Sequence, residues 1–181
     1  FHYDGQGQWN SYNSNNTGKP IDYVSQITID NEGNKWFGTI AGIGGMGSGL
    51  WRFDGNEWIG FNDDGSQIEG EVSEYGIMSL EADSQGTLWI GHKDGVLSFD
   101  GANWAEHSPP DSAIHYISAI GFGNDNRVWF GTNWNIDGEY VGGLYSYDTQ
   151  TDEWSNYNAD NSVLPDNNVM GIDVDEDGTI W

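Results

Sequence analysis

The sequence contains no cysteine, and it has only five basic residues against 29 acidic ones, which gives a formal net charge of -24. The absence of cysteine excludes disulfides and thiol catalysis. Five cations cannot neutralise a phosphate backbone, so the charge argues against nucleic acid and against an anionic membrane surface as partners. Neutral sugars, cationic ligands and divalent cations stay open. The simplest interpretation of the charge is a solvated acidic surface.

The sequence also lacks any apolar run of about 18 residues, the length that a membrane-spanning helix requires. It has no cationic and apolar stretch of the kind that forms a signal peptide. No segment shows convincing helical periodicity. We therefore expect no membrane insertion of this segment and a fold built from strands.

One 13-residue pattern recurs along the chain: apolar residues, a turn at Asp-x-x-Gly, and then x-x-Trp-x-Gly-Thr. This first motif predicts a β-hairpin with a glycine-containing loop. Its copies are 27–39, 80–92, 120–132 and a shortened one at 172–181. The third copy has Gly123 in place of the aspartate and Asn126 in place of the glycine. Asparagine tolerates the left-handed conformation better than other residues with a side chain, so we expect this turn to form as well.

A second motif follows the first and predicts a second hairpin, which turns at Asp-Gly in two of its copies. It occupies 50–58, 97–104 and 144–154, and the chain begins with another copy at 1–9. The sequence thus holds three whole four-stranded units and one unit divided between the termini. A period of about 40 residues with four strands per repeat indicates the blades of an all-β propeller.

The repeat predicts which residues are buried. We expect the inner strand to be buried between neighbouring blades through Val24, Ile27, Ile29 and their equivalents. Nine of the ten tryptophans fall on repeat positions, which makes them structural. Trp134 is the exception, because it lies in an insert.

These motifs resemble the two-component-regulator propeller repeat, whose pattern is Ile-x-x-Asp-x-x-Gly-x-x-Trp-x-Gly-Thr followed by Gly-Leu-x-x-Phe-Asp-Gly-x-x-Trp. The resemblance covers nearly the whole chain. It implies a bacterial propeller, usually seven-bladed, in the periplasmic or extracellular region of a sensor histidine kinase, often linked to polysaccharide utilisation, or in a secreted protein. The family has no fixed catalytic motif, so the resemblance implies no enzyme. Residues 1–181 supply about four blades, and we interpret them as one propeller domain that is a piece of a longer protein.

Strand direction alternates within a blade, so the long and variable loops all lie on one face, opposite the Asp-x-x-Gly turns. Loops carried by a rigid scaffold commonly hold function. This loop-rich face comprises 41–48, 63–75, 92–93, 107–115 and 134–140. Its candidate ligand-binding residues are Trp134, Tyr140, His92, Lys93, His115 and Tyr75. The aromatic rings can stack on sugars or hold cations; the alternative is that the insert packs on its own blade.

Metal and cofactor signals are weak. His92, His107 and His115 map to the loop-rich face without the spacing of a metal site. Asp173, Asp175 and Asp177 resemble the start of a calcium loop, but Asp175 also fills the turn position of the first motif, which is the simpler account. We expect no cofactor, with calcium as the alternative.

Three functions stay open. The first is an extracytoplasmic module that binds a glycan, another small ligand or a protein partner. The second is a secreted structural or assembly propeller, and the third is a lyase or hydrolase that uses the histidine-bearing face. In a closed four-bladed ring the two half units would pair with each other. In a larger ring they would lie far apart, with open edges through which the chain could self-associate. The resemblance favours the larger ring.

Overall fold

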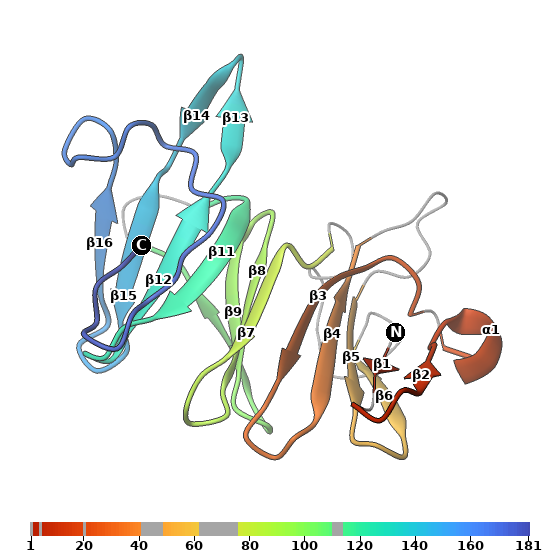
Figure 1. Ribbon diagram of the computed structural model, residues 1–181. Coiled ribbons are helices and arrows are strands. Elements are labelled where there is room, and N and C mark those ends of the chain that lie inside the picture. The colour runs from red at the N-terminus through yellow and green to blue at the C-terminus, as the bar shows by residue number, and fades with distance from the viewer. Residues whose placement is uncertain (1, 4, 20, 41–48, 62–75, 110–113) are drawn as a thin grey trace.

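Three four-stranded antiparallel sheets stand side by side, one for each whole repeat (Figure 1). The computed structural model describes residues 2–3, 5–19, 21–40, 49–61, 76–109 and 114–181, and almost all of its regular structure is β. The all-β prediction and the three whole units are thus confirmed.

Within each sheet the strands follow one another in chain order. The first sheet consists of β3 (Val24–Ile29), β4 (Lys35–Thr39), β5 (Gly49–Phe53) and β6 (Trp58–Phe61). The second consists of β7 (Ser79–Ala82), β8 (Leu88–His92), β9 (Gly95–Phe99) and β10 (Trp104–His107). The third consists of β11 (Ile117–Phe122), β12 (Arg127–Thr132), β15 (Leu144–Asp148) and β16 (Glu153–Tyr157). Between β12 and β15 the chain forms a separate two-stranded ribbon from β13 (Trp134–Ile136) and β14 (Glu139–Val141).

The turn of the first motif is held by its aspartate. Asp30 Oδ1 accepts hydrogen bonds from the backbone N–H groups of Glu32 and Asn34 at 3.0 and 2.9 Å. Gly33 adopts a φ of 83°, which a residue with a side chain rarely takes. In the third copy Asn126 adopts a φ of 63° at the same position, so the expected tolerance of asparagine is confirmed.

The glycine of Trp-x-Gly-Thr lies where the neighbouring sheet packs so closely that there is no room for a side chain. A Cβ on Gly38 would lie 2.6 Å from Ile77 Cγ2, and a Cβ on Gly91 would lie 2.6 Å from Ile117 Cγ2. Contacts this short cannot be accommodated in a packed interior, so only glycine lets the next inner strand approach. Each motif glycine is therefore a contact between successive sheets.

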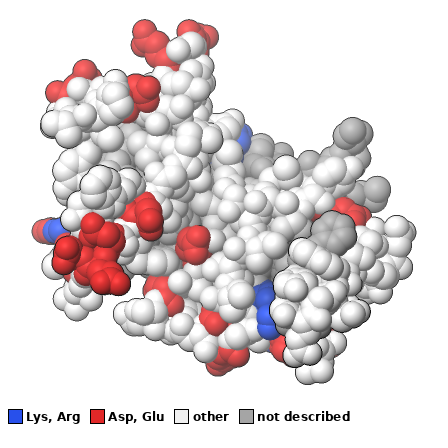
Figure 2. Space-filling model, in the orientation of Figure 1, with Lys and Arg blue, Asp and Glu red and all other residues white. Residues whose placement is uncertain are grey.

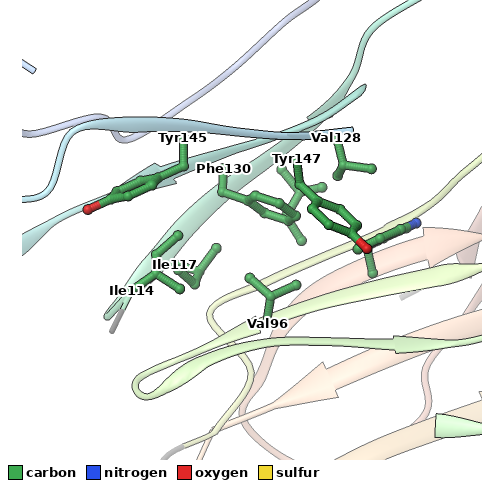
Figure 3. Packing of buried hydrophobic residues seen from close by; sticks show 9 residues of the cluster. Val96, Ile114, Ile117, Val128, Phe130, Tyr145 and Tyr147 are labelled. Carbon is green, nitrogen blue, oxygen red and sulfur yellow. The ribbon is translucent and has the colours of Figure 1, made fainter. Parts of the chain in front are cut away.

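The core lies between the sheets in two clusters. The first joins Trp36, Leu50 and Phe61 of the first sheet to the second sheet; its members from there are Ile77, Leu80, Leu88, Ile90 and Phe99. The second cluster joins the second and third sheets (Figure 3); its members are Trp89, Val96, Ile114, Ile117, Ile120, Val128, Phe130, Tyr145 and Tyr147. Burying one large apolar side chain of this kind contributes about 1.5–3 kcal/mol, so these interfaces are the main source of stability.

The two half units lie at opposite ends of the row of sheets (Figure 1). β1 (His2–Tyr3) pairs with β2 (Trp9–Asn10), and the C-terminal segment forms a bridge between Val174 and Ile180. Within the described part of the chain these two elements do not pair with each other, so the arrangement expected of a closed four-bladed ring is absent there.

One short helix was not predicted. α1 (Ser14–Thr17) is a single turn whose N-terminal amides are capped by the Asn13 side chain, and Gly18 ends it with a φ of 68°. A helix of four residues is too short to show helical periodicity in the sequence, so only its capping residues could have indicated it.

Burial of the first inner strand was predicted wrongly. Val24, Ile27 and Ile29 are 40%, 57% and 61% exposed, whereas Leu80, the equivalent of Ile27, is 2% exposed. The reason is that a sheet in this row buries one face against the preceding sheet, and the described residues place no complete sheet behind the first one. Trp181 is 76% exposed although it is a repeat tryptophan, because its equivalent Trp36 is buried against the following sheet and no sheet follows Trp181 among the described residues.

Candidate functional site

The candidate site lies where three loops meet around Trp134. The β13–β14 ribbon forms because Asp137 and Gly138 both adopt positive φ angles, 52° and 96°, as a tight hairpin turn of this type requires. The ribbon projects from the third sheet on the side opposite the Asp-x-x-Gly turns (Figure 1). It brings the side chain of Trp134, the first residue of β13, over the segment that precedes β11.

Trp134 contacts two neighbouring rings in that segment. The centroid of the His115 ring lies 4.3 Å from that of Trp134, and the two rings meet edge to face at 61°. The ring of Tyr116 is nearly parallel to Trp134, with a centroid distance of 6.4 Å. Trp134 thus packs partly on its own blade, as the alternative interpretation expected, and the residue as a whole is partly exposed.

Tyr116 is held in an unusual backbone conformation. Its φ is 52°, a left-handed value that is uncommon for a residue with a bulky side chain. Its N–H donates to the carbonyl of Lys93 at 2.8 Å, and its carbonyl accepts from the N–H of Asn133 at 3.2 Å. These bonds tie the β8–β9 turn, the start of β11 and the ribbon into one unit. Tyr23 and Gly76 also have positive φ at the same position of the first two units, so this conformation belongs to the repeat.

Asp94 supplies the charge at the centre of this unit. Its Oδ1 lies 3.8 Å from His115 Nδ1 and 3.9 Å from Lys93 Nζ. The side chains of all three residues are between a quarter and a third exposed, so the Lys93–Asp94 contact is a weak ion pair, and the His115–Asp94 contact is one only with a protonated imidazole. We call His115, Trp134, Tyr116, Asp94 and Lys93 the Trp134 cluster.

Of the residues predicted from the sequence, the structure brings together Trp134, His115 and Lys93. Tyr140 is 40% exposed but pairs with Asn135, whereas Trp134 pairs with Val141. Because alternate residues of a strand point to opposite faces, Tyr140 and Trp134 lie on opposite faces of the ribbon. Tyr75 lies outside the described residues, as do 41–48, 63–75 and 110–113 of the predicted loop-rich face.

His92 is a special case, because it occupies a structural position of the repeat. It stands where the first motif has threonine, and it is only 4% exposed. The equivalent Thr39 and Thr132 each donate a side-chain hydrogen bond to the backbone carbonyl of a glycine, Gly49 and Gly143. His92 Nδ1 instead accepts from the backbone N–H of Asp94 at 3.3 Å, so its contact with the site is through the turn that carries Asp94.

His107 lies apart from the other two histidines. Its Nε2 is 2.8 Å from Ser98 Oγ, and its ring packs against Trp89 and Tyr147 between the second and third sheets. Burial lowers the pKa of His107, and the opposing effect of the Asp152 carboxylate is smaller. The predicted set of three histidines on one face is therefore dispersed among three different environments.

The three aspartates of the calcium alternative do not converge on a site. Asp175 Oδ1 accepts the N–H groups of Asp177 and Thr179, and its Oδ2 accepts the indole N–H of Trp181 at 2.9 Å. These are the bonds that Asp30 makes in the first copy, so the turn account of Asp175 is confirmed. Among the described residues no group of three or more His, Asp or Glu side chains could hold a metal ion.

Two residues of the Trp134 cluster were missed by the sequence reasoning. Asp94 stood in the shortest middle loop, Lys93-Asp94-Gly95, which gave no sign that its carboxylate faces the next repeat. Tyr116 precedes an inner strand, at the position that Tyr23 and Gly76 occupy in the first two units, and all three have positive φ. Because one of these three equivalent residues is a glycine, the sequence did hold a sign that this position takes a positive φ.

Comparison with known proteins gives relatives by fold. No family model matches the sequence, and no curated protein matches it. The extracellular domain described as that of the hybrid two-component system BT3049 from B. thetaiotaomicron is similar with a TM-score of 0.70 and 20% identity, over 95% of this chain and 22% of that chain. The extracellular domain of BT4673 from the same organism gives 0.63 and 21%, over 87% of this chain and 18% of that one. The chain has the β-propeller fold of these domains.

A third propeller-like relative comes from another system. PorZ, a surface component of the type-IX secretion system of Porphyromonas gingivalis, gives a TM-score of 0.59 and 15% identity, over 84% of this chain and 23% of that chain. The present chain thus spans less than a quarter of the length of each of these structures. At these identities the likeness establishes the propeller fold, in agreement with the resemblance that the motifs carry.

Acidic side chains gather at several places on the surface. On the face shown in Figure 2, carboxylates gather along the lower edge, where the turns of both motifs lie, and at the tip of the β13–β14 ribbon. In the Trp134 cluster the Asp94 carboxylate lies beside the Lys93 ammonium group, so these two charges offset each other. Within the part of the chain that the structure describes, no helix is long and apolar enough to cross a membrane.

Proposed function

We propose that this chain is part of an extracytoplasmic sensor propeller that binds a neutral glycan at the Trp134 cluster. The observation that carries the proposal is the partly exposed Trp134 ring, held in place by His115 and Tyr116 beside the Asp94 carboxylate. A fixed aromatic face with neighbouring polar groups suits a sugar, whose C–H face stacks on the ring and whose hydroxyls form hydrogen bonds.

The charge of the cluster supports a neutral ligand. The chain carries a net charge of -24, so a polyanion is repelled at long range. Lys93 offsets Asp94 locally, which removes the advantage that a cation would find elsewhere on this surface. Sensor domains are also among the similar structures, and their extracellular position supports a periplasmic or extracellular location for this propeller.

A binding role is proposed in preference to catalysis. A carboxylate within hydrogen-bond reach of an imidazole, about 2.6–3.2 Å, would favour the histidine-based hydrolase or lyase. The contact of His115 with Asp94 is longer, at 3.8 Å. His92 and His107 belong to the packing of the second blade (β7–β10), which leaves His115 as the histidine of the cluster.

The test is binding of the 181-residue chain to a glycan array, followed by titration of the best ligand by calorimetry. We expect Trp134→Ala to weaken binding by about two- to tenfold, because stacking on one aromatic ring contributes about 0.5–1.5 kcal/mol. Trp9→Ala is the matched control, since Trp9 is 68% exposed and lies in the N-terminal hairpin. Tyr140→Ala reports on the other face of the ribbon and should leave the affinity unchanged.

Two results would count against the proposal. One is an array without a bound glycan, together with no change in the titration of free oligosaccharides. The other is equal loss of binding in Trp134→Ala and Trp9→Ala, which would place the ligand elsewhere or show a general loss of folding. Circular dichroism of each variant separates those two explanations.

A further inference from the structure

The turns of the first motif are tied to each other at two of the junctions between repeats. Asn31 Nδ2 donates a hydrogen bond to the carbonyl of Ser84 in the next turn at 2.7 Å. Asn124 Nδ2 donates to the carbonyl of Glu176 in the turn after its own at 3.2 Å. In both cases the second residue of one Asp-x-x-Gly turn binds the second residue of the next. A side-chain amide therefore closes each of these junctions on the turn face, the side of the sheets that carries these turns.

The junction between the second blade and the third blade (β11, β12, β15 and β16) lacks this amide. Its second turn residue is Ser84, and in the described part of the chain the shorter serine side chain forms no hydrogen bond to the next turn. A hollow of about 380 Å³ opens between the two turns instead. Its lining includes Ser84 and Gln85 from the second blade and Gly123, Asn126 and Arg127 from the third.

The third turn also lacks the aspartate that the other turns are built around. In the second blade Asp83 Oδ1 accepts hydrogen bonds from the backbone N–H groups of Gln85 and Thr87 at 2.8 and 2.9 Å. Its Oδ2 accepts from the indole N–H of Trp89 at 3.1 Å. Gly123 stands at the aspartate position of the third turn and offers no carboxylate. The third turn thus keeps a set of three N–H groups that the repeat arranges around one carboxylate, without that carboxylate.

One of these three donors is buried and unsatisfied. Trp129 Nε1 is buried and has no hydrogen-bond partner among the described residues. It lies 3.1 Å from the point that a Cβ of residue 123 would occupy, so it borders the side of the hollow that Gly123 lines. The other two donors are the backbone N–H groups of Asp125 and Arg127, by their positions in the turn. Because an unsatisfied buried donor is unfavourable, this position favours an acceptor that comes from outside the chain.

Arg127 adds a positive charge at the rim of the hollow. Its Nη1 donates to Asp125 Oδ2 at 2.6 Å, and both side chains are about half exposed. A guanidinium has five N–H donors, so Arg127 can bind a second carboxylate beside the first. Asp125 Oδ1 lies 2.6 Å from the point that a Cβ of residue 123 would occupy, which makes Asp125 the nearest competing negative charge.

We propose that this hollow binds a small molecule through a carboxylate group, which takes the place of the aspartate carboxylate missing at Gly123. The ligand carboxylate accepts the indole N–H of Trp129 and pairs with Arg127. Because the hollow, at about 380 Å³, is larger than a carboxylate group, the ligand carries further atoms, either an aliphatic tail or a sugar ring. The net charge of -24 repels anions at long range, so we expect a dissociation constant on the order of 1 mM. The site is independent of the Trp134 cluster, which lies on the opposite face.

Nitrogen-edited NMR of the 181-residue chain tests the site, because each of the ten tryptophans gives its own indole N–H signal. Acetate, butyrate and glucuronate are titrated separately, with sodium chloride at the same ionic strength as the reference. We expect the Trp129 indole signal, identified by its loss in Trp129→Phe, to shift and saturate with the acids and to stay in place with chloride. Tighter binding of butyrate than of acetate assigns an aliphatic acid as the ligand, and tighter binding of glucuronate assigns a sugar acid.

Two variants should change the affinity in opposite directions. Gly123→Asp supplies a carboxylate from the chain itself, so it should abolish binding of the acids while the protein stays folded. Asp125→Asn removes the competing negative charge, so it should lower the dissociation constant by about two- to fivefold, the usual effect of one exposed charge. Trp134→Ala is the control on the opposite face and should leave binding of the acids unchanged even where it weakens binding of a glycan.

Two results would overturn the proposal. One is a Trp129 signal that none of the three acids shifts more than chloride does, which would show that water alone satisfies the indole. The other is an equal response to the acids in Gly123→Asp, which would place the carboxylate elsewhere. Neither result bears on the glycan proposal, since that proposal is tested through Trp134 and with neutral sugars.

Discussion

The indole N–H of Trp36 donates a hydrogen bond to Asp30 Oδ2 at 2.8 Å, and this pair closes the turn of the first motif from the side. Trp89 and Asp83 make the same bond at 3.1 Å, and Trp181 and Asp175 make it at 2.9 Å. In the third copy Gly123 replaces the aspartate, and the buried Nε1 of Trp129 has no hydrogen-bond partner in the structure. An unsatisfied buried donor of this kind costs about 1–3 kcal/mol.

We therefore expect Gly123→Asp to stabilise the protein by about 1 kcal/mol, the usual contribution of one hydrogen bond. A Cβ at residue 123 would lie 3.1 Å from Trp129 Nε1, so an aspartate there can reach the indole. The same Cβ would lie 2.6 Å from Asp125 Oδ1, the end of a half-exposed side chain that can move away. Urea unfolding measures the change. Gly123→Ala makes the same contact without the acceptor, so an equal gain in that variant would refute the explanation.

The glycines of Trp-x-Gly-Thr provide the second prediction. A Cβ on Gly91 would meet Ser79 Oγ and would lie 2.6 Å from Ile117 Cβ. The inner strand of the third blade must then move away from the second, and overpacking of this kind costs about 1–3 kcal/mol. We expect Gly91→Ala to lower the free energy of unfolding by this amount. Gly171→Ala is the control, because a Cβ there meets no atom within 4 Å; comparable losses in the two variants would exclude the contact as the cause.

The third prediction concerns pH. Burial lowers the pKa of His107 below its ordinary value of 6.5, so the folded protein binds a proton at this site less readily than the unfolded chain does. Stability from the neutral imidazole is fully present above pH 6.5 and is lost as the pH falls toward the lowered pKa. We expect the free energy of unfolding to decrease on acidification from pH 6.5, before the carboxylates begin to titrate.

His107→Gln isolates this effect. Glutamine keeps a polar group near Ser98 but does not titrate, so the decrease in the free energy of unfolding below pH 6.5 should become shallower. Unfolding curves in urea across this pH range measure it. An identical pH dependence in the variant would assign the acid sensitivity to other groups, such as the aspartates of the turns, whose pKa values are lowered by hydrogen bonds and which act only at lower pH.

The sequence predicted those features that a single repeat determines by itself. The Asp-x-x-Gly turn, the left-handed turn residue Asn126 and the strand order within a sheet all depend on residues a few positions apart. Burial of Ile27 and Trp181 was predicted wrongly because it depends on a neighbouring blade, and sequence periodicity is the same with or without that neighbour.

In the candidate site, too, the sequence predicted what depends on nearby residues and missed what depends on the placement of the blades. Trp134 was found because it falls outside the repeat, and His92 could have been set aside by its alignment with Thr39 and Thr132. The opposite orientation of Tyr140 follows from the two-residue turn at Asp137-Gly138 and could have been derived by counting along the ribbon. The approach of Asp94 to His115 depends on how the second and third blades are placed, which no local pattern specifies.

The contact between each motif glycine and the next inner strand has an evolutionary consequence. Gly38 receives Ile77, Gly91 receives Ile117 and Gly131 receives Val169, so every junction uses the same pair of positions. A unit that is duplicated or deleted by recombination would meet a compatible partner on either side at once. Chains of this type can therefore change their number of repeats in one genetic step, while the inserts between strands diverge independently of that number.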